Sequence, residues 1–333
     1  MKITVVGSGA WGTALSLLLL ENGNDVTLWS FFDKETETMQ STGENPFLKG
    51  VTIPKNLKLT SDIACVSDVD AIVMATPSFA VRETMRKIAP LLSKKTVVIS
   101  VTKGIEKETS LRMTQVMDEV LCGSNTVAAL SGPSHAEEVG RRIPTACVAA
   151  CTDLAVAEWI QDLFMSERFR VYSSSDIVGV ELGAALKNVI ALCAGCCDGM
   201  GFGDNTKAML MTRGLTEIAR VGAKMGGRKE TFAGLAGMGD LIVTCTSDHS
   251  RNRRAGLLIG AGMEPQEAMK QVGAVVEGYF AAASGYAMAK KFGVEMPITE
   301  ATYNVLYNGA PLKETFASLM TRAKTHETEE SWL

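Results

Sequence analysis

The first thirty residues constrain the fold more than any other stretch of the chain. A short apolar run at residues 3–6 is followed by three glycines within six positions and then by an apolar helical pattern at residues 14–20. A second apolar run at 26–29 completes the order strand, tight turn, helix, strand. In such a unit the glycines permit the turn, let a pyrophosphate approach the backbone, and pack helix against strand. A purely structural glycine turn is the alternative. We therefore predict a dinucleotide site at Gly7, Gly9 and Gly12.

The alternation of apolar runs with helical patterns continues to about residue 175. It predicts an α/β N-terminal Rossmann domain with a mostly parallel, doubly wound sheet. The later strands are expected at 70–75, 96–101, 127–130, 145–151 and 169–172. Residues 40–60 are expected to form a loop, because glycines and prolines interrupt any period. From residue 176 only helical patterns remain. We predict a Rossmann domain at 1–175, an all-α substrate and catalytic domain at 176–325, and a frayed tail at 326–333.

Composition excludes several classes of function. The formal net charge of −4 gives no electrostatic reason to expect nucleic acid or membrane partners. The apolar run at 15–20 is too short to span a bilayer, and no secretory signal is recognised, so a cytoplasmic protein is expected. The 8 cysteines and 3 histidines form no metal-ligand spacing, and no metal is expected. The pair at positions 193 and 196 lacks a second pair, so the cysteines are interpreted as reduced, buried side chains.

The residues after the second strand select the cofactor in a Rossmann unit. A carboxylate there binds the ribose 2′-hydroxyl of NAD, and an arginine accommodates the 2′-phosphate of NADP. Here the place holds Ser30 and Phe31, Asp33 comes slightly late, and there is no arginine. The sequence leaves NAD and NADP open.

A lysine lies deep in the apolar helical pattern at 178–194. A buried lysine is costly without a partner, so Lys187 either reaches the surface or serves as an acid/base group with a shifted pKa. Asp240 is the only charge in the glycine-rich run 234–245, and we interpret it as the partner of Lys187. A turn aspartate or a helix N-cap is the alternative.

Three arginines fall within five residues at 250–254, with serine and asparagine among them. This composition suits a phosphate, because arginine binds two oxygens at once and the neutral groups add hydrogen bonds. A solvated basic face is the alternative. Lys103 and the segment 132–136 follow expected strand ends, where ligands of open α/β sheets bind. A dinucleotide site, an acid/base lysine and a phosphate-binding run at 250–254 together predict hydride transfer to a small phosphorylated ketone.

Nine motifs spread over the chain resemble the bacterial NAD(P)-dependent glycerol-3-phosphate dehydrogenases. They are GSGAWGTA (7–14), NPFL (45–48), SVTKG (100–104), SGPSHAEEV (131–139), ELGAALKNV (181–189), DGMGFGDNTKA (198–208), GLAGMGDLIVTC (234–245), SRNRR (250–254) and VVEG (275–278). The resemblance implies a Rossmann domain followed by a helical domain. It also implies reversible reduction of dihydroxyacetone phosphate to sn-glycerol 3-phosphate with NADH or NADPH, in support of phospholipid synthesis. We expect a homodimer.

The resemblance also assigns roles to individual residues. Lys187 is the proton donor and acceptor, and Asp240 supports it. The substrate-binding residues are Lys103, Gly132, Ser134, Lys187, Asn188, Asp240, Thr244, Ser250, Arg251 and Asn252. The cofactor-binding residues are Gly7, Gly9, Ala10, Trp11, Gly12, Phe31, Lys103, Ala136, Arg251, Val275 and Glu277. The family often has arginine or histidine where this chain has Phe31, which again leaves the cofactor preference open.

Two other functions fit parts of the pattern. A 2- or 3-hydroxyacid dehydrogenase of similar architecture would also pair a Rossmann domain with a catalytic lysine. It would need a carboxylate site, and the run at 250–254 together with Lys103 would lack a purpose. A non-enzymatic dinucleotide sensor would keep the glycine loop but would have no need for a buried lysine–aspartate pair.

Overall fold

The computed structural model describes residues 1–324, 326 and 327, which fold into two compact units. The first unit contains Met1–Thr102 and Met113–Ile177, and the second contains Lys103–Arg112 and the described residues from Val178 onward. The short segment Lys103–Arg112 therefore groups with the second unit, although the chain on both sides of it belongs to the first. The tail expected at 326–333 falls outside the described residues from position 328 onward.

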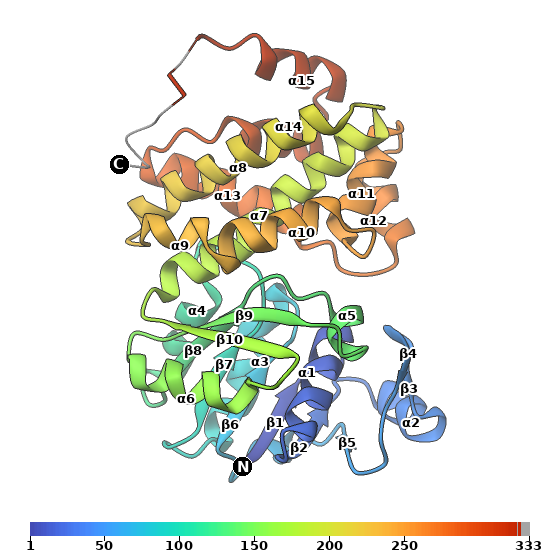
Figure 1. Cartoon of the computed structure of the whole chain (residues 1–333), viewed down its shortest axis with the longest axis vertical. Coiled ribbons are helices and arrows are strands. Elements are labelled where there is room, and N and C mark those ends of the chain that lie inside the picture. The colour runs from blue at the N-terminus through green and yellow to red at the C-terminus, as the bar shows by residue number, and fades with distance from the viewer. Residues whose placement is uncertain (325, 328–333) are drawn as a thin grey trace. The chain divides into compact units, whose positions relative to one another are not determined.

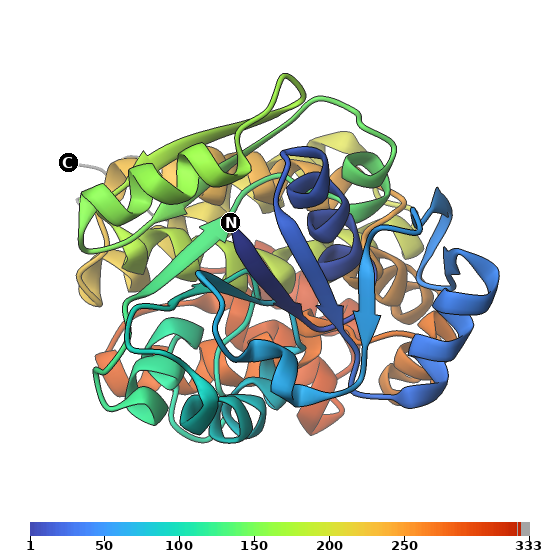
Figure 2. The same cartoon turned by 90° about the horizontal axis from the view of Figure 1, so that it is seen from below.

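The first unit is built on an eight-stranded sheet (Figures 1 and 2). Its strands lie in the order β10-β9-β8-β7-β6-β1-β2-β5. Their bounds are β1 (Lys2–Val6), β2 (Asp25–Trp29), β5 (Lys58–Thr60), β6 (Ala71–Met74), β7 (Val97–Ser100), β8 (Val127–Ser131), β9 (Thr145–Ala150) and β10 (Phe169–Ser174). Central strands such as β6 are buried along their whole length, as expected for a sheet covered on both faces.

Neighbouring strands of this sheet are parallel with one exception, the antiparallel pair β8 and β9. The helix between them, α5 (Ala136–Gly140), has only five residues. At about 1.5 Å per residue it is too short to carry the chain back along a strand, so β9 returns in the opposite direction. The expectation of a mostly parallel, doubly wound sheet is confirmed.

The expectation of a loop at 40–60 is wrong. The segment contains a hairpin of β3 (Glu44–Asn45) and β4 (Leu48–Thr52), and then β5 pairs with β2 at the edge of the sheet. The side chains of Leu48 and Val51 are buried in the core of the unit. Tertiary packing therefore forms these strands, while the local sequence has no alternating pattern that would reveal them.

Helices complete the first unit. They are α1 (Ala10–Glu21), α2 (Asp33–Thr42), α3 (Val81–Ile88), α4 (Met113–Leu121), α5, and α6 (Leu154–Phe164). Ser173 and Ser174, near the predicted end of the first domain at residue 175, belong to β10 and pair with the last two residues of β9.

Apart from the segment Lys103–Arg112, where Ile105 and Arg112 form an isolated β-bridge, the regular elements described in the second unit are helices. Its helices are α7 (Ile177–Gly199), α8 (Asp204–Lys224), α9 (Lys229–Ala233), α10 (Asp240–Thr246), α11 (Arg251–Gly260), α12 (Pro265–Val272), α13 (Glu277–Phe292), α14 (Pro297–Asn308) and α15 (Leu312–Met320). The long apolar helix α7 is central to the core (Figure 1). By length and composition α7 alone among the described helices could span a bilayer, but 89% of its apolar window is buried inside the protein, as in a core helix.

Candidate active site

The turn between β1 and α1 uses its three glycines for three different reasons. Gly7 has a positive φ of 121°, which few residues other than glycine adopt. A Cβ at Gly12 would lie 1.9 Å from the carbonyl oxygen of Gly7, so only glycine lets the helix pack this closely. A Cβ at Gly9, the N-cap of α1, would meet nothing within 4 Å. The space at Gly9 and the first N–H groups of α1 suit a pyrophosphate.

Side chains around this turn hold its shape. The buried amide of Asn45 donates to the carbonyl oxygen of Ser8 at 2.8 Å and to the hydroxyl of Thr13 at 2.7 Å. The indole N–H of Trp11 is buried and has no hydrogen-bond partner among the described residues. A buried donor of this kind is unusual and calls for an acceptor. The turn therefore fits a dinucleotide, whose phosphate oxygens accept hydrogen bonds.

The carboxyl end of β2 carries a carboxylate that the sequence did not reveal. The hydroxyls of Ser8 and Ser30 each lie 2.8 Å from Oε2 of Glu35, in the first turn of α2, and donate to it. Phe31 is 60% exposed, and the Lys87 ammonium lies 5.0 Å from the centre of its ring. An anion and a cation therefore flank the place where the adenosine ribose binds in this fold.

The remaining candidates of the first unit follow β8. The hydroxyl of Ser134 donates to the carbonyl oxygen of Gly132 at 2.9 Å, and the next residue, His135, is the N-cap of α5. Ala136 is the first, buried residue of that helix. These residues lie at the carboxyl end of a central strand, on the side where ligands of open α/β sheets bind.

Lys187 is the centre of a buried polar cluster in the second unit. It lies on α7 with only 3% of its surface exposed, so the alternative that it reaches the surface is wrong. Its Nζ donates to Oδ1 of Asp240 and, at 2.6 Å, to the hydroxyl of Thr244. The other carboxylate oxygen of Asp240 accepts from Nζ of Lys103 at 2.9 Å. One aspartate thus lies between two lysines.

This surrounding changes the proton affinity of Lys187. Burial disfavours the charged ammonium and lowers the pKa of Lys187 to about 7, and the positive charge of Lys103 acts in the same direction. The carboxylate of Asp240 opposes both effects. An amine with a pKa near neutrality can both donate and accept a proton at physiological pH.

A chain of amides extends from this cluster. The N–H of Gly278 donates to Oδ1 of Asn252 at 2.8 Å, and Nδ2 of Asn252 donates to Oδ1 of Asn188 at 2.9 Å. Nδ2 of Asn188 in turn donates to the carbonyl oxygen of Lys103 at 3.4 Å. Because each amide oxygen already accepts a hydrogen bond, both side chains are fixed in orientation. Asn188 presents its N–H groups toward Lys103.

The three arginines at 250–254 differ in their surroundings. Ser250 caps α11, accepting a hydrogen bond from the N–H of Arg253 at 3.2 Å. Arg253 itself binds Asp198 at 2.7 Å and is a structural residue. Arg251 and Arg254 are exposed, and Arg251 is the first residue of the helix. The start of α11 can therefore bind a phosphate through its backbone N–H groups and also through the guanidinium of Arg251.

Two further candidate residues lie where α13 begins. Glu277 is the first residue of α13, and Val275 lies two positions before it.

The sequence did not reveal one buried ion pair of the second unit. Arg112 forms a buried ion pair with Glu181 on α7, which fixes the segment carrying Lys103 against the helix carrying Lys187. No spacing in the sequence pairs residues 112 and 181. No group of three or more His, Cys, Asp or Glu side chains suited to a metal ion occurs among the described residues.

Comparison with known proteins identifies one family over most of the chain. The family model of the NAD-dependent glycerol-3-phosphate dehydrogenase N-terminus matches residues 2–157, and that of the C-terminus matches residues 176–317. The glycerol-3-phosphate dehydrogenase (NAD(P)+) of Bacillus subtilis is 48% identical over 99% of this chain and 96% of its own length. That of Moorella thermoacetica is 51% identical over 98% of both chains. The crystal structure of glycerol-3-phosphate dehydrogenase from Coxiella burnetii superposes with a TM-score of 0.93 at 37% identity, covering 96% of this chain and 99% of that one.

Proposed function

The chain belongs to the NAD-dependent glycerol-3-phosphate dehydrogenase family, and we propose that Lys187 is the acid/base group with which it reduces dihydroxyacetone phosphate to sn-glycerol 3-phosphate. The observation that carries this proposal is the position of Lys187: buried, hydrogen-bonded to Asp240 and Thr244, and with a pKa lowered to about 7. The enzyme is an oxidoreductase that uses NAD or NADP.

The first unit supplies the cofactor site in this proposal. Gly7, Gly9 and Gly12 bring the backbone and the start of α1 to the pyrophosphate, and the buried indole N–H of Trp11 finds an acceptor there. Bound at this site, the nicotinamide cofactor supplies the hydride for reduction and takes it up in the reverse direction. Glu35 beside the expected ribose favours NAD, and Lys87 favours the extra phosphate of NADP.

The second unit supplies the proton. As the ketone carbon becomes an alcohol, negative charge grows on its oxygen, and the Lys187 ammonium neutralises that charge and gives up a proton. Asp240 and the Thr244 hydroxyl orient the Nζ of Lys187. Burial, and to a smaller extent the charge of Lys103, keeps the pKa of Lys187 low enough for it to release the proton. In the oxidation direction the neutral amine accepts the proton of the alcohol.

The phosphate of the substrate binds at the start of α11 in this proposal. Arg251, the first residue of the helix, contributes charge. The next residue, Asn252, is hydrogen-bonded to Asn188 in the chain that ends at Lys103. Binding energy from this remote group holds the ketone in place for the reaction.

Substrate comparison tests the proposal against a hydroxyacid dehydrogenase and a dinucleotide sensor. The purified protein is mixed with NADH or NADPH and one of three ketones: dihydroxyacetone phosphate, dihydroxyacetone or a 2-oxo acid. Loss of the nicotinamide absorbance is expected with the phosphorylated ketone and not at comparable rates with the others. Faster turnover of the 2-oxo acid would support the hydroxyacid dehydrogenase, and no turnover of any ketone would support the sensor.

We also propose that the protein works in the cytoplasm, as a homodimer, in the supply of glycerol phosphate for phospholipids. The support is the resemblance of its motifs to the bacterial enzymes and their high identity to it. Mass photometry of the purified protein at nanomolar concentration tests the dimer: a monomer mass would contradict it.

A further inference from the structure

A cavity of about 1070 Å³ lies within the second unit, away from the cluster around Lys187. It is bounded by α7, α8, α14 and α15, and neither Lys187, Asp240 nor Thr244 lines it. Its volume slightly exceeds the range of about 300–1,000 Å³ that is typical of sites for small organic molecules, so a ligand of that size fits. The proposed reaction makes no use of it.

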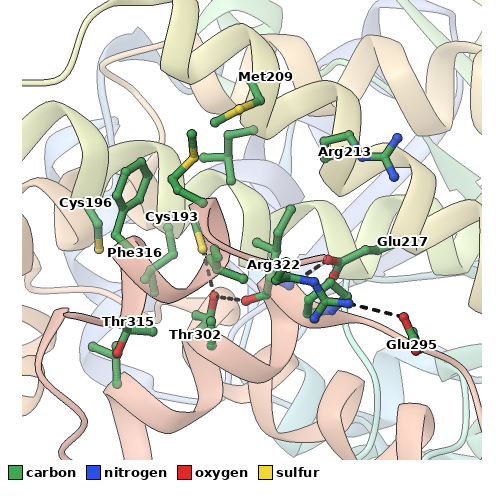
Figure 3. Close-up of a pocket in the computed structure, with 18 of the residues that line it drawn as sticks. Cys193, Cys196, Met209, Arg213, Glu217, Glu295, Thr302, Thr315, Phe316 and Arg322 are labelled. Atoms are coloured by element: carbon green, nitrogen blue, oxygen red, sulfur yellow. Dashed lines mark hydrogen bonds and ion pairs between the residues drawn. The ribbon is translucent and has the colours of Figure 1, made fainter. Parts of the chain in front are cut away.

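The two sides of this cavity differ in chemistry (Figure 3). One side carries sulfur and aromatic groups, with Cys193, Cys196, Met209 and Phe316. The other side carries charged groups, with Arg213, Glu217, Glu295 and Arg322. An occupant that matches both sides has an apolar part and a charged part.

The apolar side is uncharged at physiological pH. Burial raises the pKa of the Cys193 thiol to about 12, and its sulfur lies 2.8 Å from the hydroxyl of Thr302. The pKa of Cys196 is raised as well, again by burial. These thiols therefore act as small apolar groups, and the surface between α7 and α15 suits an aliphatic chain.

The charged side is positive overall. The described lining residues include four cations, Arg213, Arg220, Lys224 and Arg322, but only two carboxylates. Glu217 accepts hydrogen bonds from the first residues of α14, and Oε2 of Glu295 lies 3.3 Å from Nη2 of Arg322, so Glu295 offsets one of the four cations. Burial also raises the pKa of Glu217 to about 7, which reduces its negative charge at neutral pH. This end of the cavity favours an anion.

We propose that this cavity binds a long-chain aliphatic carboxylate, with its tail between α7 and α15 and its head at Arg213 and Arg322. Apolar burial supplies the affinity, and the arginines fix the direction in which the molecule enters. The site is separate from the dehydrogenase site and does not depend on the proposed function.

The contribution of the aliphatic tail to the affinity is tested by calorimetric titration of the purified protein with octanoate, decanoate and dodecanoate, each below its micelle concentration. We expect one molecule to bind per chain, with affinity rising about fourfold for each methylene added. Dodecanol and dodecyltrimethylammonium, which have the same tail and a different head, should bind at least about tenfold more weakly than dodecanoate. An absence of saturable binding, or affinity that does not depend on tail length, would overturn the proposal.

Variants at the charged end of the cavity test whether the arginines there bind the carboxylate head. Arg322→Gln, at a half-exposed position, should weaken dodecanoate at least about fivefold, and adding Arg213→Gln should weaken it at least about twentyfold. Dodecanol binding should stay unchanged in both. Lys313→Gln is the matched control, because this exposed residue of α15 loses the same charge without lining the cavity.

Equal dodecanoate affinity in the wild type and both arginine variants would overturn the assignment of the head. Light scattering during the titration checks a different occupant. If dodecanoate splits an oligomer into monomers, a second copy of the chain fills the cavity and the proposal is wrong.

Discussion

The glycine turn of the first unit and the lysine cluster of the second are both suited to charged ligands, but they differ in construction. The turn offers backbone N–H groups, a helix start and space at Gly9, with no charged side chain among its glycines. The cluster consists of charged side chains in a buried setting, with Asp240 between two lysines. The turn binds through backbone N–H groups, which do not titrate, whereas burial in the cluster lowers the pKa of Lys187. The first arrangement suits holding a cofactor, and the second suits moving a proton.

The largest expected effect is in the cluster. Lys187→Gln removes the acid/base group and should lower kcat for dihydroxyacetone phosphate reduction by at least about a hundredfold. Cofactor affinity, measured by fluorescence titration with NADH, should remain near that of the wild type. Lys313→Gln, on the exposed face of α15, is the control and should keep its full rate. A Lys187→Gln enzyme with more than a tenth of wild-type kcat would break the assignment.

The turn is tested by two substitutions with opposite expectations. Gly12→Ala places a Cβ 1.9 Å from a carbonyl oxygen and should lower the free energy of unfolding by about 1–3 kcal/mol. Gly9→Ala meets no protein atom and should change that free energy by less than about 1 kcal/mol, yet raise KM for NADH at least about tenfold. Urea unfolding and steady-state kinetics measure the two quantities. Unchanged KM in Gly9→Ala would mean that the pyrophosphate does not approach this residue.

A smaller effect is expected at the phosphate end of the second unit. Arg251→Gln removes a charged donor and should raise KM for dihydroxyacetone phosphate about tenfold or more. Turnover of unphosphorylated dihydroxyacetone should change less than about twofold. Arg254→Gln, which removes the same charge from another exposed position of α11, is the comparison. Equal losses with both ketones would contradict a phosphate contact.

The smallest effect is a shift of the pH profile. Reduction requires the Lys187 ammonium, so kcat/KM for the ketone should fall as pH rises through about 7, while oxidation should gain over the same range. Lys103→Met removes a positive charge that lowers the pKa of Lys187, so the falling limb should move to higher pH. Lys103→Arg keeps the charge and should leave the limb in place. A limb that stays fixed in Lys103→Met would exclude this electrostatic role.

The same contrast explains what the sequence could predict. The residues of the turn are contiguous in the sequence, so the glycine spacing and the flanking apolar runs are enough to predict a dinucleotide site there. The pairing of Lys187 with Asp240 was inferred because each is an isolated charge in an apolar or glycine-rich run. The contact of Lys103 with that same aspartate was not predicted, because residues 103 and 240 meet only in the folded unit.

Other misses have the same physical origin. Glu35 reaches Ser8 and Ser30 from the next helix, and Arg112 reaches Glu181 across 69 positions of the chain. The hairpin at β3 and β4 and the edge strand β5 are stabilised by tertiary packing and pairing, which leave no period in the local sequence. Sequence patterns show local periodicity and the residue types within one segment. Side-chain partners that come from distant segments are seen only in the folded chain.

The central claim is that Lys187 changes protonation near neutral pH. Titration of the ¹³Cε resonance of Lys187, in protein labelled with ¹³C-lysine and assigned by its loss in Lys187→Gln, tests this directly. The account predicts a midpoint near pH 7 for Lys187, well below the ordinary range of exposed lysines. A resonance that stays in the ammonium form up to pH 10 would contradict it.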